Sequence, residues 1–290
     1  MQPVTKETLS FLLITFLLSA LPIALLIYVG RTDIGLTVGA LMWCPGLAAF
    51  LTCVLFKIKI STLGWRFYPL KYECIAYLLP IFYALPVYLV VWLTVSHSMD
   101  YATFTKSQSL LYGLPDCPQF ATWAVSIPFI MTIGIIRSIA VALGEEIGWR
   151  GFLLPRLYVQ MGYTRACFAS GIIWAVWHYA GIFYYDQNGS TPKIEALICF
   201  TLTVISVSFI LGYIRLKAQS IWPCAMLHAS HNVVIQIIFN PMTAQTGKAV
   251  YFVGEYGVGL VVTTSILALW YWHKSAQLPK HKINKMLSVE

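Results

Sequence analysis

The chain has 290 residues, of which 59% are hydrophobic and only 10% are charged. A soluble domain carries about 25% charged residues, so too few charges remain here to cover a water-facing surface of this size. The net charge of +8 does not indicate a nucleic-acid-binding protein, because the basic residues lie in short segments between long apolar runs. This composition predicts an integral protein of the lipid bilayer.

The apolar residues fall into eight runs, each close to the ~20 residues that a helix needs to cross the hydrocarbon core. The runs are 9–29, 35–56, 75–95, 122–146, 165–184, 194–214, 219–239 and 251–272. They predict an all-α polytopic membrane protein of about eight transmembrane helices. We expect residues 1–290 to form a single membrane-embedded domain, with the motif-bearing core at about 122–240.

The distribution of positive charge predicts the orientation of these helices. With eight spans, the segments between the runs alternate between the two sides of the membrane. Fourteen of the nineteen Lys and Arg residues then lie on the side of the termini, four lie on the other side, and Arg137 lies within a run. Since cytoplasmic loops carry the excess of Lys and Arg, we expect both termini in the cytoplasm.

Ionisable side chains within apolar runs are expensive, by about 2.5–3.5 kcal/mol each on insertion scales, and therefore point to function. The first group is Glu145, Glu146 and Arg150, at the end of the fourth run. Glu146 and Arg150 are four residues apart and share a helix face, whereas Glu145 is turned by about 100°. An ion pair of Glu146 with Arg150 would leave Glu145 to face a cavity as a general base. The alternative is a charge cluster at the headgroups.

Two further groups lie on later runs. His178 shares a helix face with Trp174 in the fifth run, and could equally be a histidine bonded to a neighbouring helix. In the seventh run, His228 and Asn232 are four residues apart, and both can donate a hydrogen bond to an oxyanion. His231 lies nearly in line with His228 and is interpreted as a supporting or packing residue.

One internal site accounts for all three groups at once. If the three polar groups each faced lipid separately, the insertion penalty would be incurred three times, whereas a shared polar cavity removes it. Such a cavity would hold a base, a partner that orients water and donors for a tetrahedral oxyanion. These are the components of amide hydrolysis.

The order of the motifs resembles a known family. Glu-Glu-x-x-x-Arg at 145–150, an aromatic residue followed by x-x-x-His at 174–178, and His-x-x-x-Asn at 228–232 are similar to the CPBP family of CAAX proteases and bacteriocin-processing enzymes. The resemblance implies that Glu145 is the catalytic glutamate and that His178 helps it to activate water. It also implies that His228 and Asn232 stabilise the oxyanion.

The resemblance leaves Glu146 and Arg150 in supporting positions, for which we infer a structural role. In one departure, bacterial members often have proline two residues after the counterpart of His178, where this chain has Ala180.

Metal dependence has two interpretations. The family was long classed with metalloproteases, and Glu145, His178 and His228 would be the ligands if Zn²⁺ were bound. The chain has no His-Glu-x-x-His motif, and we favour water activated by glutamate and histidine without a metal or other cofactor.

The sequence thus predicts an intramembrane endopeptidase of a bacterial inner membrane. Its expected substrate is a membrane-associated protein or peptide, and whether that substrate is prenylated stays open. Two alternatives remain. One is an ion-coupled transporter, because polar residues at the midplane also mark ion paths. The other is a catalytically silent immunity or binding protein on the same scaffold.

Overall fold

The computed structural model describes residues 5–29, 34–67, 70–114, 117–184, 191–244 and 247–278. Every one of the eight apolar runs is helical over most of its length, as predicted. The helices are α1 (Lys6–Val29), α2 (Ile34–Leu55), α3 (Leu70–Thr94), α5 (Gln119–Phe129), α6 (Ile135–Glu146), α7 (Leu154–Tyr184), α8 (Lys193–Ala218), α9 (Trp222–His231) and α10 (Val258–Lys274). A further short helix, α4 (Tyr101–Leu111), lies in the connection between α3 and α5.

Three of the helices continue through π-helical turns, which are wider than α-helical turns. These are Ile130–Gly134 between α5 and α6, Ile147–Leu153 between α6 and α7, and Asn232–Phe239 after α9. The backbone N–H of Leu154, for example, donates to the carbonyl oxygen of Trp149, five residues earlier. Turns of this kind occur often at functional sites. Two of the three lie directly beside predicted site residues.

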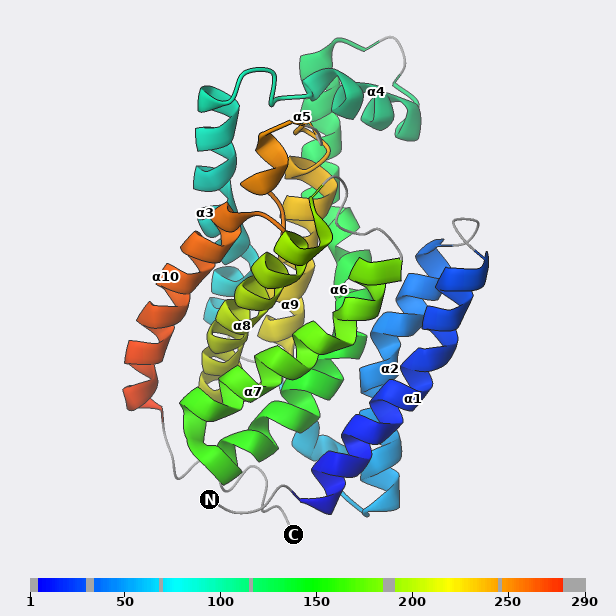
Figure 1. Ribbon diagram of the computed structural model, residues 1–290, viewed down its shortest axis with the longest axis vertical. Coiled ribbons are helices and arrows are strands. Elements are labelled where there is room, and N and C mark those ends of the chain that lie inside the picture. The colour runs from blue at the N-terminus through cyan, green and yellow to red at the C-terminus, as the bar shows by residue number, and fades with distance from the viewer. Residues whose placement is uncertain are drawn as a thin grey trace.

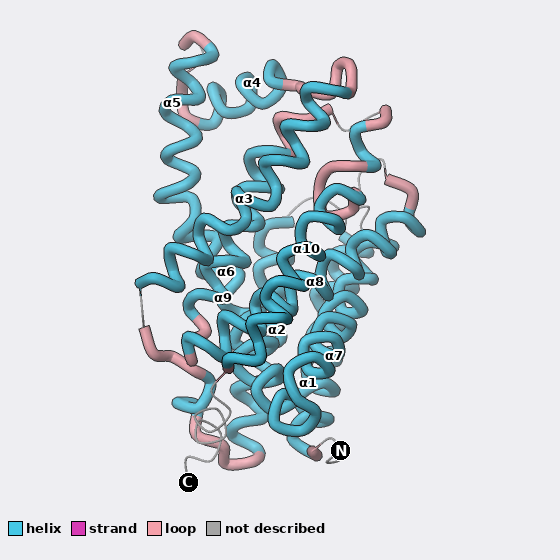
Figure 2. Tube along the Cα trace, turned by 90° about the vertical axis from the view of Figure 1, so that its left-hand side faces the viewer, coloured by secondary structure: helices cyan, strands magenta, loops and turns pink. Residues whose placement is uncertain are grey.

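The helices form a bundle in which most axes run roughly along its long direction, while α4 lies across one end (Figures 1 and 2). α1 packs on α2 and α2 on α6, while α7 packs on α8, α8 on α10 and α3 on α9. Figure 2 shows the described part of the chain to be mostly helical. Met99 and Thr243 form an isolated antiparallel β-bridge between two of its loops.

Five helical stretches are long and apolar enough to cross a membrane, judged by length and composition over the described residues. One of them, Gln119–Tyr184, has 66 residues, far more than a single crossing needs. Gly162 divides it, since its φ of 76° is left-handed and the chain turns sharply within α7 there (Figure 1). Large apolar side chains such as Leu13, Leu17 and Leu21 are more than 60% exposed, as lipid-facing residues are. The all-α polytopic prediction is confirmed.

Close helix contacts hold α6 against α2. A Cβ atom added to Gly144 would lie 2.7 Å from the carbonyl oxygen of Met42, and one added to Gly46 would lie 2.7 Å from the carbonyl oxygen of Gly144. Gly148 approaches Pro45 as closely. Small residues let helix backbones approach in this way within membranes. The contact fixes the position of Glu145, which follows Gly144 directly.

Some sequence expectations need correction. The last helix was predicted to begin at residue 251, but α10 begins at Val258. Tyr251 ends a short 3-10 helix (Ala249–Tyr251), and residues 252–257 form a loop in which Val253 is buried. Arg150 and Arg215 were counted among the loop cations, yet both are fully buried. Arg215 donates to the carbonyl oxygens of Arg150 and Leu63, over 2.8 and 3.1 Å. Arg31 and the lysines after residue 278 lie outside the described residues, and the predicted orientation stays a prediction.

Candidate active site

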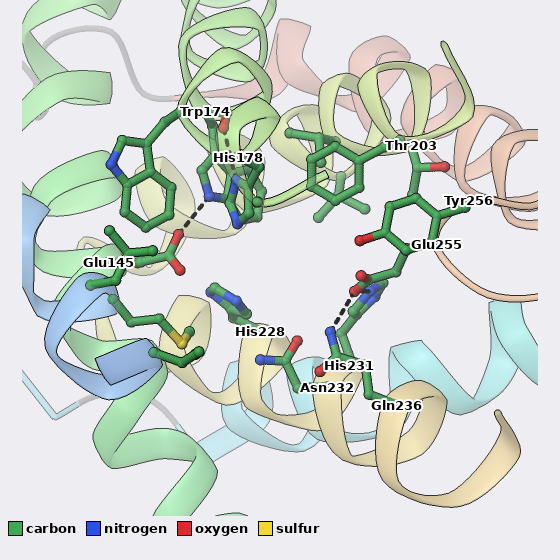
Figure 3. Close-up of a pocket in the computed structure, with 18 of the residues that line it drawn as sticks. Glu145, Trp174, His178, Thr203, His228, His231, Asn232, Gln236, Glu255 and Tyr256 are labelled. Carbon is green, nitrogen blue, oxygen red and sulfur yellow. Dashed lines mark hydrogen bonds and ion pairs between the residues drawn. The ribbon is translucent and has the colours of Figure 1, made fainter. Parts of the chain in front are cut away.

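A cavity of about 400 Å³ lies inside the helix bundle. Its walls come from α1, α2, α6, α7, α8 and α9, from the π-helical turn after α9, and from the loop before α10. Glu145, His178, His228 and Asn232 all line it (Figure 3). The four residues predicted to carry catalysis therefore meet around one chamber, although they come from three separate helical segments.

Glu145 is 1% exposed, and its two carboxylate oxygens differ in environment. Oε2 accepts hydrogen bonds from the indole Nε1 of Trp149 at 3.0 Å and of Trp174 at 2.6 Å. Oε1 has no hydrogen-bond partner in the described chain. The two indoles thus orient the carboxylate, while the other oxygen is available to a water molecule or a substrate in the cavity.

His178 is oriented by its own helix. Its Nδ1 lies 2.9 Å from the carbonyl oxygen of Trp174. A carbonyl oxygen only accepts, so we assign the proton of the neutral ring to Nδ1, which leaves Nε2 with a lone pair. The ring packs between Trp177 and Phe200, with centroid distances of 4.8 and 5.1 Å. These contacts hold a basic nitrogen at the cavity.

Glu146 is fully buried and does not line the cavity. Its Oε1 accepts from Nη1 of Arg150 at 2.9 Å, the ion pair predicted from their spacing. The same oxygen lies 2.9 Å from Nδ1 of His228. Arg150 also lies over the ring of Trp174, 4.0 Å from its centroid, and donates to Ser208 over 3.3 Å. The pair therefore contacts two of the residues that shape the cavity.

Asn232 follows His228 by one helical turn and begins the π-helical segment. It lines the same cavity and has no side-chain hydrogen bond within the described chain. The ring of His228 lies 5.4 Å from that of Trp174, centroid to centroid. An amide and an imidazole thus lie near the oriented carboxylate, with hydrogen-bonding groups still available.

The cavity has a second polar region that the sequence predictions missed. His231 bridges Tyr83 and Glu255, with Nδ1 2.5 Å from the tyrosine hydroxyl oxygen and Nε2 2.7 Å from Oε1 of Glu255. Gln236 donates to the same Glu255 oxygen over 2.9 Å. From the sequence, His231 is interpreted as a supporting or packing residue, and in the structure its ring forms hydrogen bonds with Tyr83 and Glu255. Glu255 could have been found, because it is an acid within an apolar run.

The alternative of a zinc site is tested by the ligand geometry. Within the ranges that the structure describes, no three His, Cys, Asp or Glu side chains are grouped closely enough to hold one metal ion. Glu145, His178 and His228 line one cavity, but in this arrangement they do not form a ligand set.

The fold and this site define a polytopic membrane protein with a partly open chamber between its helices, in which carboxylate, imidazole and amide groups meet. Residues 126–234 match the family model described as Type II CAAX prenyl endopeptidase Rce1-like. A curated relative, CAAX prenyl protease 2 of Methanococcus maripaludis, is 24% identical over 124 residues. That alignment covers 42% of this chain and 39% of the relative's length. The motif-bearing segment is thus similar to the Rce1-like type II CAAX prenyl endopeptidases, which confirms the resemblance found in the motifs.

Proposed function

We propose that the protein is an intramembrane endopeptidase that hydrolyses a peptide bond of a membrane-associated protein or peptide. The observation that carries this proposal is the free Oε1 of Glu145, a buried carboxylate oxygen in a cavity that also holds His178, His228 and Asn232. The comparisons support the same activity, since the matching family model is described as an endopeptidase and the curated relative is named as a protease.

In the proposed reaction, Glu145 and Nε2 of His178 hold one water molecule between them. Oε1 of Glu145 takes a proton from this water as the oxygen attacks the peptide carbonyl carbon. The carbonyl oxygen then carries the negative charge of a tetrahedral intermediate. Glu145 returns the proton to the leaving nitrogen as the C–N bond breaks.

The developing oxyanion is stabilised by Asn232 and His228. The amide of Asn232 donates one hydrogen bond. His228 donates the other when both ring nitrogens are protonated, with Nδ1–H bonded to Glu146 and Nε2–H toward the cavity. The negative charge of Glu146 stabilises this imidazolium, and the ion pair with Arg150 holds Glu146 in position. Donors fixed before the reaction stabilise a transition state without further reorganisation.

We further propose that the whole chain forms one domain around this chamber, in a bacterial inner membrane with both termini in the cytoplasm. The substrate would then enter from the inner leaflet, near the cytoplasmic end of α6. Processing of CAAX-type tails and of bacteriocin- or pheromone-type peptides both fit such a site.

The test is proteolysis by the purified protein in proteoliposomes. Membrane peptides from cells with the wild type and with Glu145→Gln would be compared by mass spectrometry, and peptides that accumulate only in the variant would be offered to both proteins. The proposal predicts cleavage by the wild type and none by the variant.

A matched control is Glu73→Gln. Glu73 is another buried carboxylate, 7% exposed and with an unpartnered Oε1, but it lies on α3 and does not line the cavity. This variant should keep cleaving. Equal cleavage by the wild type and Glu145→Gln would refute the proposal. Ion flux through the same liposomes would instead support the transporter alternative.

A further inference from the structure

Glu255 stands apart from the proposed hydrolytic machinery, yet it lines the same cavity. It belongs to the loop before α10, and its carboxylate faces the chamber across from His178 and His228 (Figure 3). Its side chain is 15% exposed, whereas Glu145 is almost completely enclosed. The proposed mechanism assigns no role to this carboxylate.

The hydrogen bonds of Glu255 hold it as an oriented anion. Oε1 accepts hydrogen bonds from Nε2 of His231 and from the amide of Gln236. The second oxygen, Oε2, therefore remains available to a group in the cavity. The Tyr83 hydroxyl can donate to Nδ1 of His231, which directs the ring proton at Nε2 to Glu255. Aligned donors of this kind fix a carboxylate and its negative charge.

The charges around the chamber are unbalanced. Its lining includes the carboxylates of Glu145 and Glu255, but it contains no lysine or arginine in the part of the chain that the structure describes. Arg150 lies behind the wall, paired with Glu146. Even with His228 protonated, two carboxylates without a lysine or arginine leave the chamber with an excess of negative charge, which attracts positive groups and repels carboxylates.

An aromatic wall connects the two ends of the chamber. The rings of His178 and Phe200 lie 5.1 Å apart, and those of Phe200 and Tyr256 lie 5.7 Å apart. The hydroxyl of Tyr256, next to Glu255, points into the chamber (Figure 3). A volume of about 400 Å³ is within the range of ligand sites and admits a short peptide segment along this wall.

From these observations we propose that Glu255 is a specificity residue that binds a basic side chain of the substrate, lysine or arginine, close to the bond that is cleaved. The carboxylate would pair with the ammonium or guanidinium group, and the aromatic wall would contact its aliphatic part. This inference rests on the proposed function and adds a substrate class to it.

The test uses synthetic peptides with one apolar membrane-spanning segment followed by a short polar tail. Each tail position in turn carries lysine, norleucine or glutamate, and the peptides are reconstituted with the protein in vesicles of phosphatidylcholine, which has no net charge. Norleucine matches lysine in its chain but lacks the ammonium group. The quantity measured is the ratio of kcat/KM for the lysine and norleucine peptides.

At one or two positions, we expect the wild type to prefer lysine by about 30-fold, which corresponds to ~2 kcal/mol at 1.36 kcal/mol per tenfold. Glu255→Gln should abolish the preference, and Glu255→Lys should replace it by a preference for glutamate. Glu73→Gln, which removes a buried acid outside the cavity, should keep the lysine preference.

A wild-type ratio within about twofold of unity at every position overturns the inference, as does a preference that survives in Glu255→Gln. Failure of the proposed function would look different, because none of the peptides would then be cleaved. Binding is therefore also measured with Glu145→Gln, through the thermal stabilisation that each peptide gives in detergent. Equal stabilisation by lysine and norleucine peptides would overturn the inference without any reference to cleavage.

Discussion

The indole Nε1 of Trp174 lies 2.6 Å from Oε2 of Glu145 and joins α7 to α6 at the carboxylate proposed to activate water. Trp149 donates to the same oxygen from within the π-helical turn that follows α6. Together they aim the remaining oxygen, which has no partner in the described chain, at the chamber.

Trp174→Phe should therefore lower turnover by about 10- to 100-fold. A hydrogen bond to a charged group contributes about 1.5–3 kcal/mol, and its loss would let the carboxylate rotate away from its working orientation. The measurement is kcat in proteoliposomes, beside the melting temperature. Trp92→Phe is the control, since the Trp92 indole donates to Thr243 outside the cavity. Equal activity of the wild type and Trp174→Phe would show that this bond is only structural.

Asn232→Ala tests the proposed oxyanion site. Removing one such donor typically lowers kcat by about 100- to 1000-fold, because the charge on the oxygen develops only during the reaction. KM should change little for the same reason. Full kinetics on one cleaved peptide would separate the two parameters. A variant with a raised KM and an unchanged kcat would assign Asn232 to ground-state binding instead.

Chelators test the interpretation of metal dependence. Cleavage should persist after prolonged treatment with EDTA and 1,10-phenanthroline, because the proposed reaction needs only Glu145 and His178 to activate water. The rate would be measured before and after treatment, with added Zn²⁺ as a separate condition. Complete inhibition that Zn²⁺ reverses would establish the zinc alternative.

The Glu146–Arg150 ion pair should be essential for stability. Arg150→Met leaves a buried carboxylate without its partner, and breaking a buried pair in this way costs about 3–5 kcal/mol. The double variant Glu146→Gln/Arg150→Met should be destabilised by less than the sum of the single variants, since it leaves no unpaired charge. Unfolding in mixed detergent micelles would measure all three. Strict additivity would mean that the two groups do not interact.

Gly144→Ala should destabilise the contact between α6 and α2 by about 1–3 kcal/mol, as expected for an overpacked core. The new methyl group would meet backbone atoms of Met42 and Trp43 at 2.7 Å. Gly39→Ala on α2 is the matched control, because nothing lies within 4 Å of its added Cβ. Both variants would be compared by thermal unfolding. A Gly144→Ala protein as stable as the control would rule out a close contact here.

Much of this architecture can be predicted from the sequence, because apolar runs of about 20 residues and the insertion penalty of charges constrain a membrane protein strongly. The same penalty identified Glu145, His178 and His228 as candidates, and they line one cavity. Glu255 meets the same criterion but was placed at the start of a helix that begins three residues later, at Val258.

Other features depend on tertiary contacts that a single sequence does not show. From the sequence, Arg215 is predicted to be a loop cation beside Lys217. The structure shows instead that its guanidinium group donates hydrogen bonds to the carbonyl oxygens of Arg150 and Leu63. The π-helical turns are equally difficult to predict from the sequence, since their residues follow ordinary helical patterns. The indole bonds to Glu145 illustrate both cases, because one partner is local and the other lies 29 residues away.

The two adjacent glutamates each have a partner four residues ahead, Trp149 for Glu145 and Arg150 for Glu146. Proteins are synthesised from the N-terminus, so this short segment enters the membrane well before His228, which lies 82 residues beyond Glu146. A nascent helix can thus give each of its two acids one hydrogen-bond partner from within, before any later helix arrives. The same six residues that shape the finished site thus lower the cost of placing its two acids in the membrane during synthesis.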